Sequence, residues 1–401
     1  MDRHPQADGL SIDLPSADGS LEAYRLRGPK AFVKPSKPFT RIAYAAAHVV
    51  ADPLSAKEPW LDAAIDWDAT IAYRRHLSSW GFGIAEAMDT AQRGMGLDWA
   101  NSLELIHRTL ESVPGALVAS GAGTDHLPSG EKHSIERIRE AYEEQCAAIE
   151  KLGGRIILMA SRALAASARS PDDYAKVYDR ILGQVKQPVI IHWLGEMFDP
   201  ALEGYWGERD HYEAMNVCLD VLARNSSKVD GIKISLLDKE KEIAMRRRLP
   251  KGVRMYTGDD FNFAELIEGD TQGFSDALLG IFDAIAPAAS QALGFLSQND
   301  RKNYHEVLAP TVPLSRHIFK APTRFYKTGV VFMAWLNGHQ EHFVMVGGQQ
   351  SARNVLHFAE LFRLADAAGL LQDPELACKR MKHLLALNGI CLLYTSPSPR
   401  D

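Results

Sequence analysis

The chain has 401 residues, of which 46% are hydrophobic and 24% are charged, and its formal net charge is −6 at pH 7. This composition is typical of a globular protein and argues against nucleic acid or an anionic membrane surface as a partner. No apolar run approaches the length of a membrane span, and the N-terminus lacks the apolar core of a signal peptide, so we expect a cytoplasmic protein. The spacing of the four cysteines indicates neither a disulfide framework nor a zinc site; they are Cys146, Cys218, Cys378 and Cys391.

The first 38 residues differ in composition from the rest of the chain. Residues 1–38 are rich in Pro, Gly, Ser and Asp with little hydrophobic periodicity, so we expect an N-terminal extension that lies over the main domain. Beyond them, short apolar runs alternate with segments of helical periodicity, which indicates βα units and a parallel sheet. We predict eight strands, in the runs 41–50, 81–88, 115–123, 154–160, 188–195, 230–235, 253–258 and 277–283.

Eight such units over about 250 residues favour an α/β protein with the (β/α)₈ TIM-barrel fold. A doubly wound sheet is the alternative, but no G-x-G-x-x-G follows the first predicted strand. We place the barrel at 39–298 and a C-terminal helical appendage at 299–390, in which 330–338 form a buried helix. Residues 391–401, CLLYTSPSPRD, are similar to a translated sequencing-adapter tail, so we expect a non-native tail and a missing natural C-terminus.

Lys233 lies in an unusual position for a charged residue, between two isoleucines of the apolar run VDGIKIS. Side chains alternate along a strand, so Ile232 and Ile234 should face the outer helices while Lys233 projects into the barrel between Gly231 and Ser235. Burial lowers the pKa of an amine, and a neutral amine can attack a carbonyl carbon. A lysine that extends from a strand end to solvent is the alternative, and spacing alone does not decide between the two.

Several segments resemble, in the same order, the dihydrodipicolinate synthase/N-acetylneuraminate lyase family of class I aldolase-type barrels. They are LVASGAGTD, GGRIILMA with the following PVIIHW, VDGIKIS, the stretch from MYTGDD to SQAL, and the helical C-terminus. The resemblance implies a lyase, aldolase or dehydratase in which Lys233 forms an imine with a small carbonyl substrate. It also implies that no metal or other cofactor is needed, and that the protein is a homo-oligomer.

The sequence departs from this family at two motifs. The family's fifth strand ends in Tyr-Asn, whose tyrosine relays protons, whereas this chain has His192-Trp193, and histidine can also relay protons. The family's Gly-Thr-Thr-Gly-Glu binds the keto-acid carboxylate, whereas this chain reads AMDTAQRGMG. Asp89 would repel a carboxylate there unless Arg93 offsets its charge. These departures favour a substrate other than pyruvate.

The predicted site combines these residues with other polar side chains at strand ends. Their hydroxyl, carboxylate and imidazole groups suit a sugar-derived keto acid or keto-sugar. The catalytic candidates are Lys233 and His192, and the substrate-binding candidates are Glu86, Asp89, Thr90, Arg93, Asp125, His126, Trp193, Ser235 and Asp259.

A metal-dependent enzyme is the alternative hypothesis. A divalent ion would then serve an isomerase or hydrolase of a sugar-like substrate. No His-x-His or His-Glu-x-x-His motif supports this alternative. A barrel that binds a sugar acid without turning it over is a third reading. The candidate ligands of the ion are Glu86, Asp125, His126, His192 and Asp259.

Overall fold

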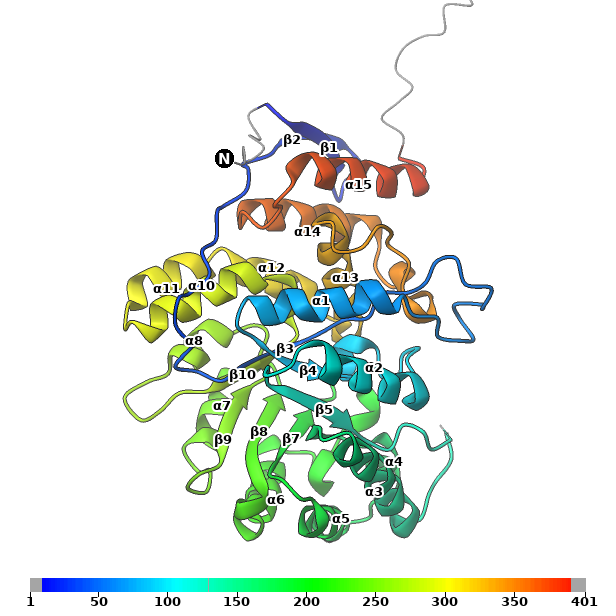
Figure 1. Cartoon of the computed structure of the whole chain (residues 1–401), viewed down its shortest axis with the longest axis vertical. Helices are drawn as coiled ribbons and strands as arrows, with labels where there is room; N and C mark the ends of the chain where they lie inside the picture. Colours follow the sequence, from blue (N-terminus) through cyan, green and yellow to red (C-terminus); the bar gives the residue numbers. More distant parts are fainter. Residues whose placement is uncertain (1–8, 129, 391–401) are drawn as a thin grey trace, which may run out of the picture.

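The computed structural model describes residues 9–128 and 130–390, so the predicted tail at 391–401 lies outside the described residues. Eight parallel strands close into a barrel in chain order, with the last strand paired to the first (Figure 1). The (β/α)₈ prediction is therefore confirmed, and each strand overlaps a predicted apolar run, although β8 and β10 begin one residue earlier. The strands are β3 (Ala43–Ala46), β4 (Gly83–Glu86), β5 (Val118–Ala122), β6 (Arg155–Met159), β7 (Val189–Leu194), β8 (Val229–Ser235), β9 (Arg254–Thr257) and β10 (Asp276–Leu279).

Helices follow the strands and cover the outside of the barrel. Several begin at a side chain that accepts a backbone N–H, as Asp98 does from Asn101 and Ser134 does from Arg137. These helices are α1 (Trp67–Ser79), α2 (Trp99–Ser112), α3 (Ile135–Lys151), α4 (Arg162–Ser167), α5 (Pro171–Gln184), α6 (His211–Arg224), α7 (Lys239–Arg246), α8 (Phe263–Glu268), α9 (Ile281–Ala284) and α10 (Ala286–Ser297). Short 3₁₀ turns lie at η1 (Asp89–Ala91), η2 (Pro200–Leu202), η3 (Tyr205–Gly207) and η4 (Ser226–Lys228).

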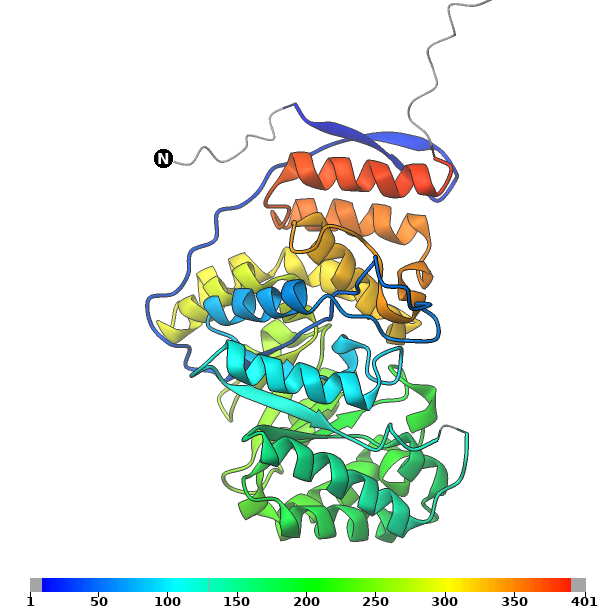
Figure 2. The same cartoon turned by 45° about the vertical axis from the view of Figure 1, so that its right-hand side comes forward.

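The rest of the chain is helical, as predicted, and packs at one end of the barrel (Figures 1 and 2). The segment 330–338 falls largely within a helix whose residues are all buried, which confirms the predicted buried helix. The division into a barrel at 39–298 and an appendage at 299–390 stays a prediction. The helices are α11 (Arg301–Leu308), α12 (Thr311–Ile318), α13 (Tyr326–Leu336), α14 (Val355–Ala367) and α15 (Pro374–Leu387), with 3₁₀ turns η5 (Thr323–Phe325) and η6 (Val346–Ser351).

The N-terminal segment contains regular secondary structure that its composition did not indicate. It forms an antiparallel hairpin of β1 (Ser11–Pro15) and β2 (Leu21–Arg25), which lies against α14 and α15 (Figure 2). Asp366 of α14 anchors it by accepting hydrogen bonds from the hydroxyl of Tyr24 (2.7 Å) and the backbone N–H of Arg27 (2.9 Å). The predicted extension at residues 1–38 therefore contains this hairpin, and its bounds stay a prediction.

Two apolar layers follow from the alternation of the barrel strands. One lies between strands and helices and contains Ile232 and Ile234, which are 0% and 1% exposed. The other fills the inside of the barrel and includes Ala85, Ile157 and Tyr256. Consecutive residues of a strand face opposite layers, so Lys233 belongs to the inside. None of the helices in residues 9–128 and 130–390 is both long enough and apolar enough to cross a membrane.

Candidate active site

Lys233 is buried inside the barrel at the carboxyl end of β8, with 7% of its surface exposed. It borders a small cavity of about 10 Å³, which is room for roughly one water molecule. Burial lowers the pKa of the Lys233 amine, although the carboxylates of Asp260 and Asp89 act in the opposite direction. An amine with a lowered pKa is more often neutral near pH 7, and only the neutral form is a nucleophile.

A glycine on the neighbouring strand end allows this placement. A Cβ atom added to Gly258 would lie 2.7 Å from Cε of Lys233, closer than such atoms approach. Gly231 makes room for a different residue, because a Cβ atom there would lie 2.6 Å from the Tyr256 ring. The space beside Gly231 is therefore filled by Tyr256, whereas Ser235 borders the cavity at Lys233.

Asp260 borders the same cavity as Lys233 and is not among the site residues predicted from the sequence. Burial raises its pKa to about 7, while the charge of Lys233 acts in the opposite direction. One carboxyl oxygen accepts the backbone N–H of Ile281 at 2.9 Å, which fixes the side chain. The amine has a lowered pKa and the acid a raised one, so the single proton of the pair can reside on the acid. Both groups are then neutral.

A hydroxyl pair completes the walls of this cavity. The Tyr326 hydroxyl, at the start of α13, lies 2.8 Å from the Thr90 hydroxyl in η1. Both residues border the Lys233 cavity, and burial raises the pKa of Tyr326 well above its usual value. The predicted residue Thr90 thus lines the cavity at Lys233, and its partner comes from the C-terminal helices, which no motif linked to the barrel.

A larger pocket of about 690 Å³ adjoins the cavity, and the two share Asp89 and Leu194. His192 faces this pocket from β7, where it is the strand partner of Lys233 on β8. Its Nε2 lies 3.2 Å from the Ser235 hydroxyl, and its buried Nδ1 has no hydrogen-bond partner among the described residues. Burial, and then the charge of Lys233, hold the pKa of His192 well below its usual value. The imidazole is therefore neutral at pH 7 and can both donate and accept a proton.

Arg93 and Asp125 also border the large pocket, but they bind each other. The Arg93 guanidinium donates to Asp125, to Gln145 (2.9 Å) and to the carbonyl of Gly121 (2.8 Å). Burial favours the neutral form of Asp125, yet Arg93 holds its pKa below the usual value. Arg93 is thus bound to Asp125, and its contacts do not indicate that it offsets the charge of Asp89.

Two cations that the sequence reading did not select, Lys132 and Arg162, border the large pocket as well. Arg162 forms an ion pair with Asp199, which is also a lining residue. Neither cation belongs to a recognisable motif, and the position of Arg162 just after the predicted strand 154–160 is the one sequence signal that could have indicated it.

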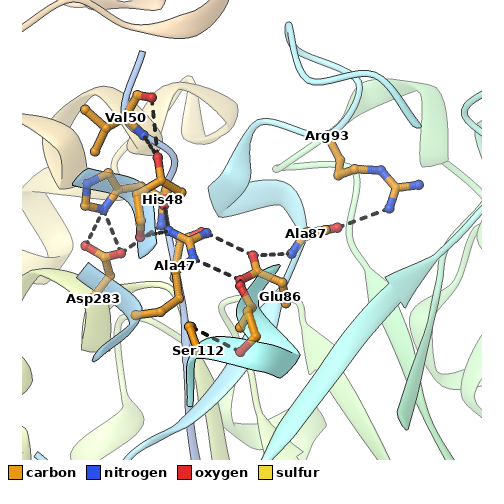
Figure 3. Close-up of polar contacts among 11 residues, drawn as sticks. Ala47, His48, Val50, Glu86, Ala87, Arg93, Ser112 and Asp283 are labelled. Atoms are coloured by element: carbon orange, nitrogen blue, oxygen red, sulfur yellow. Dashed lines mark hydrogen bonds and ion pairs between the residues drawn. The ribbon is translucent and has the colours of Figure 1, made fainter. Parts of the chain in front are cut away.

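Glu86 lies outside both cavities, in a buried ion pair with Arg74 of α1 (Figure 3). Its carboxylate accepts two hydrogen bonds from Arg74 at 2.9 Å, one from Thr109 at 2.7 Å and one from the backbone N–H of Ala87 at 2.7 Å. Every lone pair of the carboxylate is therefore occupied by protein donors. The geometry does not support the predicted contact of Glu86 with a substrate.

Three further candidates also face away from the pocket. Trp193 packs against Trp206 in the layer between strands and helices, with ring centroids 6.4 Å apart. His126 is held between Glu144 (2.9 Å) and Gln145 (2.8 Å). Asp259 accepts the backbone N–H groups of residues 261 and 262, which fixes the turn before α8. Asp259 thus fixes the turn, whereas its neighbour Asp260 borders the cavity at Lys233.

The five candidate metal ligands do not converge. Glu86 is bound to Arg74 and Asp259 to the turn before α8, while Asp125 pairs with Arg93. Within residues 9–128 and 130–390, no group of three His, Cys, Asp or Glu side chains is placed to hold a metal ion. The geometry therefore offers no support to the metal-dependent alternative.

A family model described as "Protein of unknown function (DUF993)" matches residues 12–390. The chain belongs to this family. No curated protein matches the sequence of this DUF993 chain.

Solved structures of dihydrodipicolinate synthases share the fold of the DUF993 chain, which confirms the predicted resemblance at that level. The Aquifex aeolicus enzyme is 11% identical with a TM-score of 0.62, and the alignment covers 82% of this chain and 98% of that one. An Acinetobacter baumannii enzyme complexed with pyruvate is 15% identical with a TM-score of 0.59, covering 82% and 99%. YagE of Escherichia coli K12, in complex with pyruvate, is 12% identical with a TM-score of 0.61, covering 88% and 99%.

Proposed function

We propose that the protein is a class I aldolase-type lyase in which Lys233 forms an imine with the carbonyl carbon of a small substrate. The burial of Lys233 beside Asp260, in a cavity that adjoins a larger pocket with several polar side chains, is the observation that carries this proposal. Two solved structures of the same fold hold pyruvate, a small carbonyl compound, which supports a carbonyl substrate.

The first step needs a neutral amine and a proton donor, and the cavity supplies both. The lone pair of Nζ attacks the carbonyl carbon, and a proton moves from nitrogen to the carbonyl oxygen, which gives a carbinolamine. Protonated Asp260 then transfers its proton to the hydroxyl, which leaves as water while nitrogen becomes an iminium. The resulting Asp260 carboxylate stabilises the positive charge of the iminium.

The second step uses the iminium to accept electrons. In carbon–carbon cleavage the β-hydroxyl loses its proton and becomes a carbonyl, the bond between the α and β carbons breaks, and its electron pair flows toward the iminium nitrogen to give an enamine. In dehydration an α proton is lost to give the enamine, which then expels the β-hydroxyl group as water after that group is protonated. Neutral His192, hydrogen-bonded to Ser235, and the Tyr326–Thr90 hydroxyl pair are placed to move protons to and from the substrate. Addition of water to the restored iminium then releases the product and the amine.

The substrate class follows from the sizes and linings of the two spaces. The cavity at Lys233 accommodates about one water, so the bulk of a substrate must occupy the adjoining pocket of about 690 Å³. That pocket carries hydroxyl, carboxylate, imidazole and guanidinium groups, including Thr124, Ser161 and His192. We therefore propose a sugar-derived keto acid or keto-sugar, whose hydroxyl groups would pair with this lining.

Borohydride trapping with a panel of carbonyl compounds tests both parts of the proposal. The panel contains pyruvate, sugar-derived keto acids and keto-sugars, and peptide mass spectrometry locates the adduct. We expect a substrate-dependent mass increase on Lys233, largest with a polyhydroxylated compound, and unchanged after EDTA treatment. Reaction with pyruvate alone would contradict the proposed substrate class, and turnover without any adduct would contradict the imine.

The rate of adduct formation should depend on pH as a bell-shaped curve. At low pH the Lys233–Asp260 pair binds two protons and the amine is charged, whereas above about pH 7 Asp260 loses the proton that dehydration needs. Asp260→Asn should slow adduct formation about 10²- to 10⁴-fold and remove the decline on the alkaline side. Stopped trapping reactions from pH 5 to 9 measure this, and an unchanged alkaline decline in Asp260→Asn would refute the role of Asp260.

Tyr326 offers an independent test of the hydroxyl pair. Tyr326→Phe removes one hydroxyl and keeps the ring, so we expect kcat to fall about 10²-fold with little change in the thermal unfolding midpoint. Tyr304→Phe is the matched control, because the Tyr304 hydroxyl is also buried but donates to the Ala264 carbonyl at 2.7 Å, away from the site. Equal losses of kcat in both variants would exclude a specific role for Tyr326.

A further inference from the structure

A second, partly open space lies away from the candidate active site, between α1, α9, α10 and α13. Its volume is about 160 Å³, and it shares no lining residue with the cavity at Lys233 or with the large pocket. Aromatic walls are provided by Tyr73 and Trp80, and two histidines, His76 and His339, complete the polar part of the lining. An engineered cavity of about 150 Å³ holds benzene, so this space has room for a single ring.

The two histidines face each other with unused ring nitrogens. The ring centroids of His76 and His339 are 4.3 Å apart, and the Tyr73 ring lies 5.0 Å from His339. Neither imidazole has a hydrogen-bond partner in the described part of the chain. Burial lowers the pKa of both residues, that of His339 to about 3. Each ring is therefore neutral at pH 7 and offers one N–H donor and one acceptor.

The charged group in the lining of this space is already engaged by a neighbouring residue. Asp283 is the one ionisable carboxyl group in it, and its oxygens accept the backbone N–H and Nδ1 of His48, both at 2.9 Å. An anionic ligand would be repelled by the Asp283 carboxylate, and a cationic ligand would find both of its oxygens already bound to His48, so either would lose its hydration without full compensation. A neutral ligand with a donor and an acceptor on one flat ring matches the neutral histidines and the aromatic walls.

We propose that this space, lined by Tyr73, His76, Trp80, Asp283, Met333 and His339, is a regulatory binding site for a small neutral nitrogen heterocycle. The proposal that the site is regulatory rests on the proposed function, because it requires that the β4–η1 segment carry catalytic groups. The proposal that the site binds a ligand does not depend on that function.

A continuous set of polar contacts connects the site to that segment. The Tyr73 hydroxyl donates to the Asp283 carbonyl at 2.6 Å, and the Asp283 carboxylate holds His48. The His48 carbonyl in turn accepts a hydrogen bond from Arg74, which forms the ion pair with Glu86 (Figure 3). A ligand that displaces the Tyr73 ring therefore acts on the first member of a chain of buried contacts.

The chain of contacts ends where the backbone is strained. Glu86 accepts the N–H of Ala87, whose φ of 50° lies in the left-handed region that residues with a Cβ rarely adopt. The Ala87 carbonyl accepts a hydrogen bond from Arg93 at 3.2 Å (Figure 3), and Asp89 and Thr90 follow in the same segment. A change at Glu86 would thus shift the residues that border Lys233.

Isothermal titration calorimetry of the full chain with pyrazole at pH 7.5 tests the binding site. Pyrazole is neutral and carries one donor and one acceptor on a single ring. We expect saturable binding of one molecule to the wild type, and affinities weaker by at least about tenfold for His339→Phe, which removes the ring nitrogens, and for Ala284→Leu, which fills the space. The exposed His107→Phe is the control and should bind as the wild type does.

Absence of saturable binding to the wild type, or wild-type affinity in the cavity variants, would overturn the site. Thermal unfolding shows which variants are folded, and one folded cavity variant is sufficient to decide. Hydrogen exchange of peptides that cover residues 83–93 tests the coupling without reference to catalysis. We expect pyrazole to change their exchange, and unchanged exchange at saturation would overturn the regulatory part. Absence of any adduct on Lys233 in the separate trapping experiment would instead contradict the proposed function.

Discussion

Lys233→Met is expected to lower turnover by about 10⁴-fold or more and to abolish the borohydride-dependent mass adduct. Methionine has nearly the length of lysine and no amine, so the substitution removes the nucleophile while filling the same space. The variant should fold, because replacing a buried ionisable side chain by an apolar one of similar shape removes a desolvation cost. Steady-state kinetics and peptide mass spectrometry measure the two effects.

Lys228→Met provides the matched control. Lys228 precedes the same strand at its other end, where its amine donates to the Val185 carbonyl at 2.8 Å, far from the carboxyl ends of the strands. Wild-type kcat and adduct yield are expected for this variant. Full activity of Lys233→Met would show that the reaction proceeds without an imine, and the proposal would then have to be abandoned.

The fold and the position of Lys233 could be predicted because both depend on short-range periodicity. Eight apolar runs at regular spacing define the barrel strands, and strict alternation in VDGIKIS determines which face of β8 Lys233 occupies. Once the barrel is known, the strand ends define where a site can lie. Local pattern and global fold agree in this part of the chain.

The remainder of the site depends on geometry that no spacing rule provides. Asp259 and Asp260 are adjacent and identical in type, and the turn after β9 alone decides which one faces Lys233. Tyr326 belongs to a helix 93 residues further along the chain than Lys233, and its contact with Thr90 exists only once α13 packs on the barrel. The contacts of Glu86 could not be predicted for a related reason, because a glutamate at a strand end can turn outward to an arginine of the preceding helix, here Arg74 of α1.

The N-terminal hairpin did have a sequence signal. Ile12 and Leu14 alternate with polar residues, and Asp18-Gly19 is a common turn dipeptide between two strands. The high content of Pro, Ser and Gly obscured this pattern. A two-stranded hairpin is marginal on its own, and the contacts of β1 with α14 and α15 stabilise it here.

Glu86→Ala is expected to lower the free energy of unfolding by about 3–5 kcal/mol, because it leaves the Arg74 guanidinium buried without its counter-charge. Both side chains of this pair are 0% exposed. The carbonyls of Ala47 and His48 remain as acceptors for Arg74, but they carry no charge to offset it. Urea unfolding monitored by circular dichroism measures the loss.

Two further variants distinguish the effect of breaking the buried ion pair from the effect of removing any carboxylate. Glu104→Ala removes the partner of Arg108 in an exposed pair on α2, and should change the free energy of unfolding by less than about 1 kcal/mol. Arg74→Met combined with Glu86→Leu removes both charges and should recover most of the stability lost in Glu86→Ala. If instead Glu86→Ala proves as stable as the wild type and loses only substrate affinity, Glu86 contacts the substrate after all. The position of the β4–η1 segment would then depend on something other than the Arg74–Glu86 pair.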